Sequence, residues 1–311
     1  MPDVSADGRM PIVDVTEPMG ESGSRPVSQS PSAPTAAPIS ESRAARRAAR
    51  EERRRNPILP PIATERRLTL VPATAVFALL LALATAADHA LGAAAIAWGG
   101  LVVAWGWPEL MGSSSRFGSS LAIGLAGVLA PTAVALTPDE PYLRHVPVVV
   151  ALALLSMFMH QLLRRDGRPR LTQSLAVSGA GIAVAAIGAA YVPLGRTSGG
   201  REVVTVVMAA LALSAVADLG APFARARSWM LPVAGAIALV VGGVAGLFVD
   251  VVGWPSGALL GVVAGTLAHV MRRTLCTLSP IRGMRGQITA AAASVLVTAV
   301  PVYLLSRILV G

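Results

Sequence analysis

Ionisable side chains inside apolar stretches are the residues of this sequence that could carry chemistry. Four of them lie within or beside apolar runs: Glu109, His160, Asp218 and His269. Charged groups are costly in such surroundings, so each one is a functional candidate. Asp218 could orient His160 or His269 as a general base, which makes these three the candidate catalytic residues.

Arginine supplies all 26 basic residues, and the chain has no lysine. Mechanisms that need a lysine base, a Schiff base or a phosphate-loop lysine are therefore excluded. Arginines beside apolar runs suit a phosphorylated, membrane-embedded ligand, because guanidinium groups bind phosphate by charge-assisted hydrogen bonds. The candidate lipid phosphate-binding residues are Arg225, Arg272, Arg273, Arg282 and Arg285. In a simpler interpretation, Asp218 pairs with Arg225 and the histidines lie at a hydrated interface.

Composition places these residues in a membrane protein. The 311 residues are 54% apolar and 14% charged, with a mean hydropathy of +0.63, outside the range of a soluble domain. Apolar runs long enough to cross a bilayer are drawn at 68–87, 90–107, 119–137, 146–163, 172–192, 203–219, 230–249, 255–271 and 287–306. The expected fold is all-α, a polytopic transmembrane helix bundle of about nine spans, and a separate soluble catalytic domain is excluded.

The arginines predict the orientation of this bundle. Counted on alternate connections, 22 lie on the side of the N-terminal tail and four on the other side. The positive-inside rule then predicts a cytoplasmic N-terminus and an outside C-terminus. Aromatic residues are expected at both interfaces: Trp105, Trp107 and Trp229 at cytoplasmic ends, and Tyr142, Tyr191 and Trp254 at outer ends.

Two regions are expected, a tail at 1–67 and a transmembrane domain at 68–311. The tail is rich in Pro, Ser, Gly and Arg and should be disordered, with a short helix at 40–55. It should attract anionic lipid headgroups by charge. No nucleic-acid partner is expected, because no aromatic residue lies among its arginines.

Small residues recur every four positions in two of the apolar runs. Gly242 and Gly246 lie in one run, and Gly257, Gly261 and Gly265 lie in the next. Such stripes let helices approach closely, so a contact within the bundle is favoured over a homodimer face, which stays an alternative. The single cysteine permits no intramolecular disulfide.

Four segments, in chain order, carry a resemblance to a known family. They are WPEL at 107–110, the arginine loop 164–170 leading to YV at 191–192, SAVADLGAPFAR around Asp218, and Arg272 with Arg273 before a last helix reading AVPVYLL. This order resembles the phosphatidate cytidylyltransferase (CDP-diacylglycerol synthase) family over most of residues 68–311. The resemblance implies cytidylyl transfer to a lipid phosphate, with Asp218 on the side of a bound magnesium ion.

The family signature itself is missing. After Arg273 the chain reads TLCTLSPIRGMRGQIT, without an acid or a histidine, and no acid follows Asp250. In the family those acids are thought to hold the magnesium that aligns the nucleotide phosphates, and arginine cannot coordinate a cation. We therefore expect no cytidylyl transfer and no cofactor or metal; magnesium would be needed only if that activity were retained.

The sequence thus predicts an integral, multi-pass protein of a bacterial cytoplasmic (inner) membrane that handles or senses phospholipid or polyprenyl-phosphate headgroups without catalysis. One alternative is a small-solute transporter or channel-like permease, which the prolines at 131, 193 and 301 favour and the absence of an internal repeat opposes. Another is an enzyme of lipid metabolism with altered chemistry. Membrane lipids are the expected partners, with a membrane protein or a second copy as further alternatives.

Overall fold

The helices of the computed structural model follow the apolar runs of the sequence. The structure describes residues 68–164, 171–221, 223, 228–278, 281 and 283–310. Within these ranges every regular element is a helix, and nine segments are long and apolar enough to cross a membrane. The predicted all-α polytopic bundle is therefore confirmed. The tail at 1–67, with its expected helix at 40–55, lies outside the described residues.

Ten α-helices and four short 3₁₀ segments are found in this part of the chain. The α-helices are α2 (Leu70–Ala87), α3 (His89–Leu110), α4 (Arg116–Leu136), α5 (Val146–Leu163), α6 (Leu171–Ile187), α7 (Gly200–Ser214), α8 (Met230–Leu247), α9 (Gly253–Leu275), α10 (Met284–Leu296) and α11 (Ala299–Leu309). The 3₁₀ segments are η1 (Tyr142–His145), η2 (Gly188–Tyr191), η3 (Pro193–Gly195) and η4 (Ala215–Gly220). The boundaries lie within a few residues of the predicted runs.

The last predicted span is broken into two helices. α10 ends at Leu296 and α11 begins at Ala299. Pro301 has no N–H to donate to the carbonyl of Val297, four residues earlier, so the helix breaks one turn before the proline. By contrast, Pro131 lies inside an uninterrupted α4 and Pro193 begins η3.

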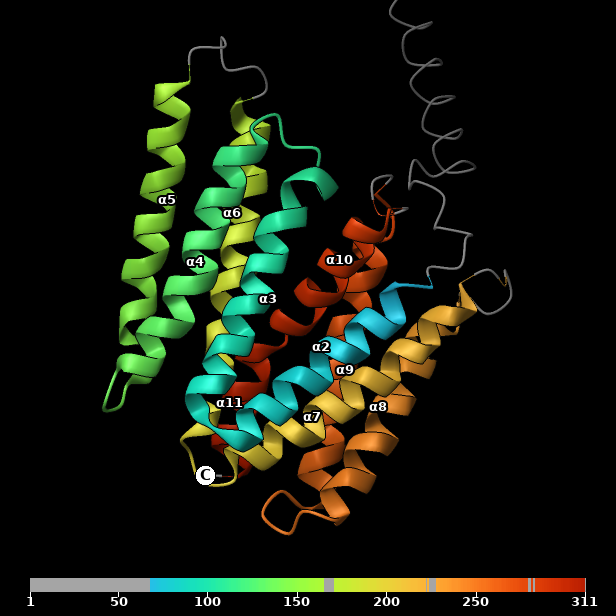
Figure 1. The fold of residues 1–311 in the computed structure, drawn as a ribbon. Coiled ribbons are helices and arrows are strands. Elements are labelled where there is room, and N and C mark those ends of the chain that lie inside the picture. Colours follow the sequence, from blue (N-terminus) through green and yellow to red (C-terminus); the bar gives the residue numbers. More distant parts are fainter. Residues whose placement is uncertain are drawn as a thin grey trace, which may run out of the picture. The chain divides into compact units, whose positions relative to one another are not determined.

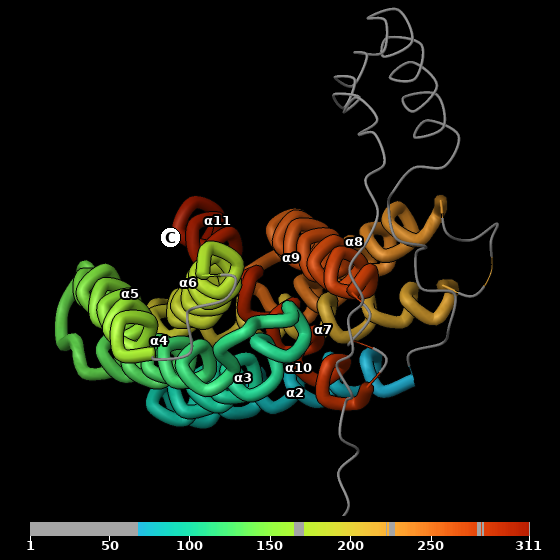
Figure 2. Tube along the Cα trace, turned by 90° about the horizontal axis from the view of Figure 1, so that it is seen from above, coloured from blue at the N-terminus to red at the C-terminus, as the bar shows by residue number. Residues whose placement is uncertain are grey.

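The helices at the two edges of the bundle are exposed, and the middle of the bundle is filled by α6 and α10. Figures 1 and 2 show α5 at one edge beside α4, and α8 at the opposite edge beside α9. The most apolar window of the segment containing α5 is 22% buried, against 67% for the segment formed by α6, η2 and η3. Most of the surface of α5 is therefore left uncovered by the rest of the described bundle.

Glycines set the closest helix contacts. A Cβ added to Gly242 in α8 would lie 2.3 Å from the carbonyl oxygen of Gly257 in α9. Between α3 and α4, a Cβ added to Gly100 would lie 2.6 Å from Cα of Gly127. The predicted contact of the glycine stripes within the bundle is therefore confirmed.

We call the end of the bundle where α2 begins, and where α3, α5 and α9 end, the tail-side end, and the opposite end the far end. Exposed tryptophans mark both ends: Trp105 and Trp229 on the tail side and Trp254 on the far side. Two predicted interface residues are instead in the core. Trp107 is 2% exposed and donates from Nε1 to the carbonyl of Val177, and the buried hydroxyl of Tyr191 lies 2.6 Å from Oγ1 of Thr298. The interface prediction is wrong for both.

Polar groups at the far end close helix termini. Asp88 Oδ1 accepts a hydrogen bond from the Ala90 N–H at 2.7 Å, which caps α3 and keeps the pKa of this exposed carboxyl below its usual range. Arg196 donates to the carbonyl of Ala135, in the last turn of α4, and to that of Thr137, the C-cap residue of the helix. These contacts give Asp88 and Arg196 structural roles.

Candidate anion-binding site

Asp218 contacts two side chains of α9 on the tail side of the bundle. Its Oδ1 lies 2.8 Å from Nδ1 of His269, and its Oδ2 accepts a hydrogen bond from Nε of Arg272 at 2.5 Å. His269 and Arg272 are three positions apart in α9, so they share one helix face. We call Asp218, His269 and Arg272 the Asp–His–Arg cluster.

Small residues bring the two elements of the cluster together. A Cβ added to Gly265 in α9 would lie 3.3 Å from Cβ of Ser214, the last residue of α7. Asp218 lies four residues after Ser214, and His269 lies four residues after Gly265. The close approach at Gly265 therefore places the carboxylate beside the imidazole one turn further on. The glycine stripe that predicts helix packing also positions the candidate site.

The cluster is buried, yet part of it lacks hydrogen-bond partners. The side chains of His269 and Arg272 are 0% exposed and that of Asp218 is 11% exposed. In the described part of the chain, Nη1 and Nη2 of Arg272 and both ring nitrogens of His269 have no hydrogen-bond partner, so the 2.8 Å approach of His269 Nδ1 to Asp218 is an ion-pair contact. Buried donors without acceptors are rare because they forfeit their hydration. The arrangement therefore calls for an acceptor beside Arg272.

The two Nη groups of Arg272 that lack partners indicate which chemical group could accept their hydrogen bonds. Nε is occupied by Asp218, which leaves the two Nη groups as a fork. Such a fork matches two oxygens of a phosphate or a carboxylate group. His269, whose Nδ1 faces Asp218, keeps Nε2 for a second contact to the same ligand. The chemistry that the cluster offers is anion binding, with an imidazole beside the anion.

The other candidate arginines lie in different places. Arg285, at the start of α10, pairs with Glu109 at 2.8 Å and stacks on the Trp105 ring at 4.6 Å. Glu109 is thus part of a second, more exposed group and not of the Asp–His–Arg cluster. Arg273 is partly exposed at the end of α9. Arg225 and Arg282 lie outside the described residues, and so does the expected Asp218–Arg225 pair.

His160 does not share the cluster. Its Nε2 lies 2.9 Å from Oγ of Ser115, at the tail-side ends of α5 and α4. Gly118 makes room for the ring, since a Cβ there would lie 1.9 Å from Cδ2 of His160. The structure therefore brings Asp218 to His269 and places His160 in contact with a hydroxyl instead.

A serine network beside His160 was not anticipated from the sequence. Ser178 donates to Ser119 at 2.7 Å, and Gln161 donates to Ser174 at 3.0 Å. Ser115 and Ser119, and Ser174 and Ser178, are each four residues apart, which is the pattern that could have revealed the network. These hydrogen bonds join α4, α5 and α6, so the network accounts for the buried serines by helix packing.

Asp218 does not fit a magnesium site. Both of its oxygens face nitrogen donors, one of them on a guanidinium group that would repel a cation. In the described ranges, no three His, Cys, Asp or Glu side chains gather where they could hold a metal ion. The family resemblance implies that Asp218 lies beside a bound magnesium ion, and the geometry of its carboxylate does not support that role.

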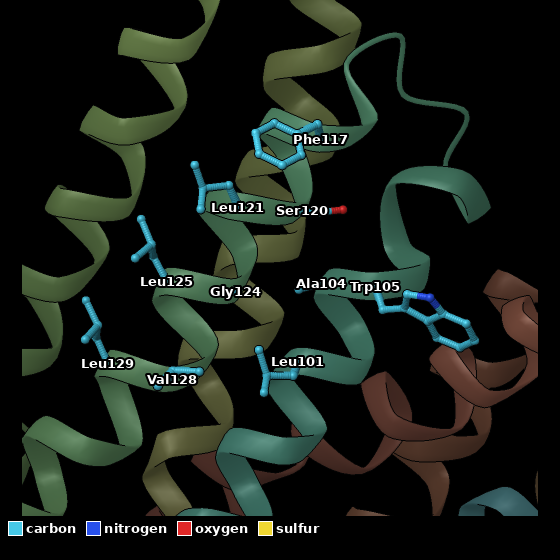
Figure 3. A pocket seen from close by; sticks show the side chains of 10 residues that line it. All are labelled: Leu101, Ala104, Trp105, Phe117, Ser120, Leu121, Gly124, Leu125, Val128 and Leu129. Carbon is cyan, nitrogen blue, oxygen red and sulfur yellow. The ribbon is translucent and has the colours of Figure 1, made fainter.

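An apolar groove lies between α3 and α4 on the bundle surface (Figure 3). Its volume is about 550 Å³, and Leu101 and Trp105 line one wall while residues from Phe117 to Leu129 line the other. Ser120 and Trp105 bear the polar side-chain atoms of this lining. The groove suits the acyl chains of the bilayer and offers no chemistry of its own.

Comparison with known proteins adds no identification. No protein-family model, curated protein sequence or solved structure matches the chain. The resemblance to CDP-diacylglycerol synthases therefore stays a prediction.

Proposed function

We propose that this membrane protein binds the phosphate group of an anionic lipid, a phospholipid or a polyprenyl phosphate, at the Asp–His–Arg cluster, without cytidylyl transfer. One observation carries the proposal: the fully buried guanidinium of Arg272 has both Nη groups without partners in the described part of the chain. A buried arginine in a membrane segment normally marks a binding site or a charge pathway.

The depth of Arg272 favours a lipid phosphate over a solute held at mid-membrane. Arg272 lies three residues before the end of α9, which is roughly 5 Å along the helix axis. Lipid phosphates lie at the edges of the hydrocarbon core, which is roughly 30 Å thick. A headgroup phosphate would thus meet Arg272 at a matching depth.

The orientation belongs to the same proposal. With 22 arginines on the tail side and four on the far side, the tail-side end faces the cytoplasm of a bacterial cell. The cluster then binds lipids of the cytoplasmic leaflet of the inner membrane, and the arginine-rich tail attracts anionic lipids to the same leaflet.

An enzyme of altered chemistry is the second candidate, favoured by the 2.8 Å contact of Asp218 with His269. A carboxylate that orients an imidazole is the arrangement of a general base. In that case His269 would take a proton from a hydroxyl of the ligand or from water beside the phosphate. Conversion of a bound lipid, followed by mass spectrometry, distinguishes this candidate from binding alone.

The test is equilibrium binding to the purified full-length protein in maltoside micelles, which contain no phosphate. The probes are short-chain phosphatidate, phosphatidylglycerol and polyprenyl phosphate, with diacylglycerol as the phosphate-free probe and inorganic phosphate as the lipid-free one. CTP with magnesium tests the family resemblance in a separate arm. We expect the lipid phosphates to bind and diacylglycerol and CTP not to bind.

The decisive variant is Arg272→Lys, which keeps the charge beside Asp218 but removes the Nη fork. We expect a loss of at least about tenfold in lipid-phosphate affinity, the equivalent of one charge-assisted hydrogen bond. The matched control is Arg307→Lys, at an exposed pair on the far end. Equal binding by both variants, or binding of inorganic phosphate as tight as that of the lipids, would contradict the proposal.

A further inference from the structure

The charge of the Asp–His–Arg cluster limits the ligand that it can accept. Asp218 and Arg272, in contact at 2.5 Å, carry opposite charges, so the pair is neutral. His269 adds one positive charge only when both of its ring nitrogens are protonated. The cluster is therefore neutral, or positive by one.

The described elements packed around α9 and η4 carry few other ionisable residues. α2 and α8 carry no ionisable residue. Arg201 and Glu202 lie in the first turn of α7, at the far end of the bundle. Tyr303 and Arg307 lie on α11. Arg285 on α10 is paired with Glu109. Arg273 follows Arg272 directly, and adjacent helix positions do not face each other.

An uncompensated charge is strongly unfavourable at a site whose nitrogen atoms are buried. One negative charge beside the neutral cluster would leave a net charge of −1. Protonation of His269 removes that charge and turns Nε2 into a donor toward the ligand, while the Nδ1–H still faces Asp218. A dianion would leave a net charge of −1 even then.

On the basis of the proposed function, we infer that the Asp–His–Arg cluster binds a singly charged phosphate, a lipid phosphodiester, together with one proton. The proton comes from bulk water and resides on Nε2 of His269, which donates it to a phosphate oxygen in a hydrogen bond. No covalent bond forms or breaks in the ligand. Phosphomonoesters, which carry between one and two charges near pH 7, bind less well as they lose their second proton.

The experiment measures lipid affinity in maltoside micelles between pH 6 and pH 8 at constant salt. Phosphatidylglycerol is the diester probe, since its own charge does not change in this range, and phosphatidate is the monoester probe. For the wild-type protein, the Kd of phosphatidylglycerol should rise with pH by up to about tenfold per unit, the limit for uptake of one proton. At pH 8 phosphatidate should bind at least about tenfold more weakly than phosphatidylglycerol, because it brings the second charge.

Two matched variants test whether the pH dependence of lipid affinity comes from His269 or from another histidine. His269→Asn keeps a donor toward Asp218 at the position of Nδ1 and removes Nε2, so its Kd should not change with pH. His145→Asn, at an exposed residue of the far end, should keep the wild-type slope. If His269→Asn does not fold, the wild-type slope and the diester preference still decide the question.

The two proposals fail in different ways. Measurable binding of phosphatidylglycerol that is independent of pH, or a wild-type slope in His269→Asn, would overturn the proton-linked binding and leave the lipid-binding role intact. Absence of binding of every lipid phosphate at every pH would overturn the lipid-binding role itself.

Discussion

At the scale of single residues, the carboxylate of Asp218 neutralises the buried guanidinium of Arg272. Removing one member of a buried ion pair leaves the other charge uncompensated, which typically costs about 3–5 kcal/mol. An exposed ion pair is worth about 0–1 kcal/mol, because water screens both charges. The Asp218–Arg272 and Glu140–Arg307 pairs are examples of the two situations within one chain.

We therefore predict that Asp218→Asn destabilises the protein by about 3 kcal/mol or more, because Arg272 loses its counter-ion. Glu140→Gln should change stability by less than about 1 kcal/mol. Unfolding of both variants in the same detergent, followed by circular dichroism, makes the comparison. Equal stability of the two variants would mean that the cluster is hydrated and not buried.

The members of this cluster could be named from the sequence, but their pairing could not. Ionisable residues in apolar runs are rare, so Asp218, His269 and Arg272 stand out. The simplest pairing joins Asp218 to Arg225, seven residues later in the chain. Contact with α9 depends on the approach of that helix at Gly265, which hydropathy does not encode.

At the scale of helices, glycines decide which elements touch. The Cβ atom of an alanine at Gly242 would meet the backbone of α9, which cannot move away as a flexible side chain can. Gly179 in α6 lies in the interior of a helix too, but an added Cβ there would meet open space. Alanine substitutions at these two positions therefore distinguish the effect of helix packing on stability from the effect of helix propensity.

We predict that Gly242→Ala lowers stability by about 1–3 kcal/mol, because α8 and α9 must separate. Gly179→Ala should leave stability unchanged or raise it by up to about 1 kcal/mol, the difference in helix propensity. Thermal unfolding of both variants provides the measurement. Tolerance of alanine at position 242 would show that the two helices are not packed as closely as described.

The helices themselves were largely predictable, because a membrane span needs about 20 apolar residues and leaves a plain signal in the sequence. The predicted run 287–306 is drawn as one span although Pro301 stands out as an interruption, since the residues around Val297 are as apolar as those of a continuous span. The cause of the break between α10 and α11 is the missing N–H of Pro301, which acts one turn upstream. Trp107 shows the same limit of sequence-based prediction. Its residue type suggests a membrane interface, but in the structure its side chain is buried and its Nε1–H donates to the carbonyl of Val177.

At the scale of the whole molecule, the distribution of arginine predicts the orientation in the membrane. The single cysteine, Cys276, can be replaced by serine to give a background for labelling. Exposed serines lie at both ends: Ser228 before α8 on the tail side, and Ser198 before α7 on the far side.

In the Cys276→Ser background, we predict that Ser198→Cys reacts with a membrane-impermeant maleimide on intact cells. Ser228→Cys should react only after the membrane is permeabilised. The reverse pattern would place the tail outside and the Asp–His–Arg cluster in the outer leaflet, against the positive-inside rule.

In the proposed function, a lipid phosphate completes the hydrogen bonds of Arg272. The most direct measurement is a cryo-electron microscopy structure of the full-length protein with phosphatidylglycerol. We predict phosphate oxygens within about 2.7–3.2 Å of Nη1 and Nη2 of Arg272, with Nε2 of His269 turned toward the same phosphate. Nη groups bonded to protein atoms or to water alone, with lipid phosphates elsewhere, would contradict the proposed function.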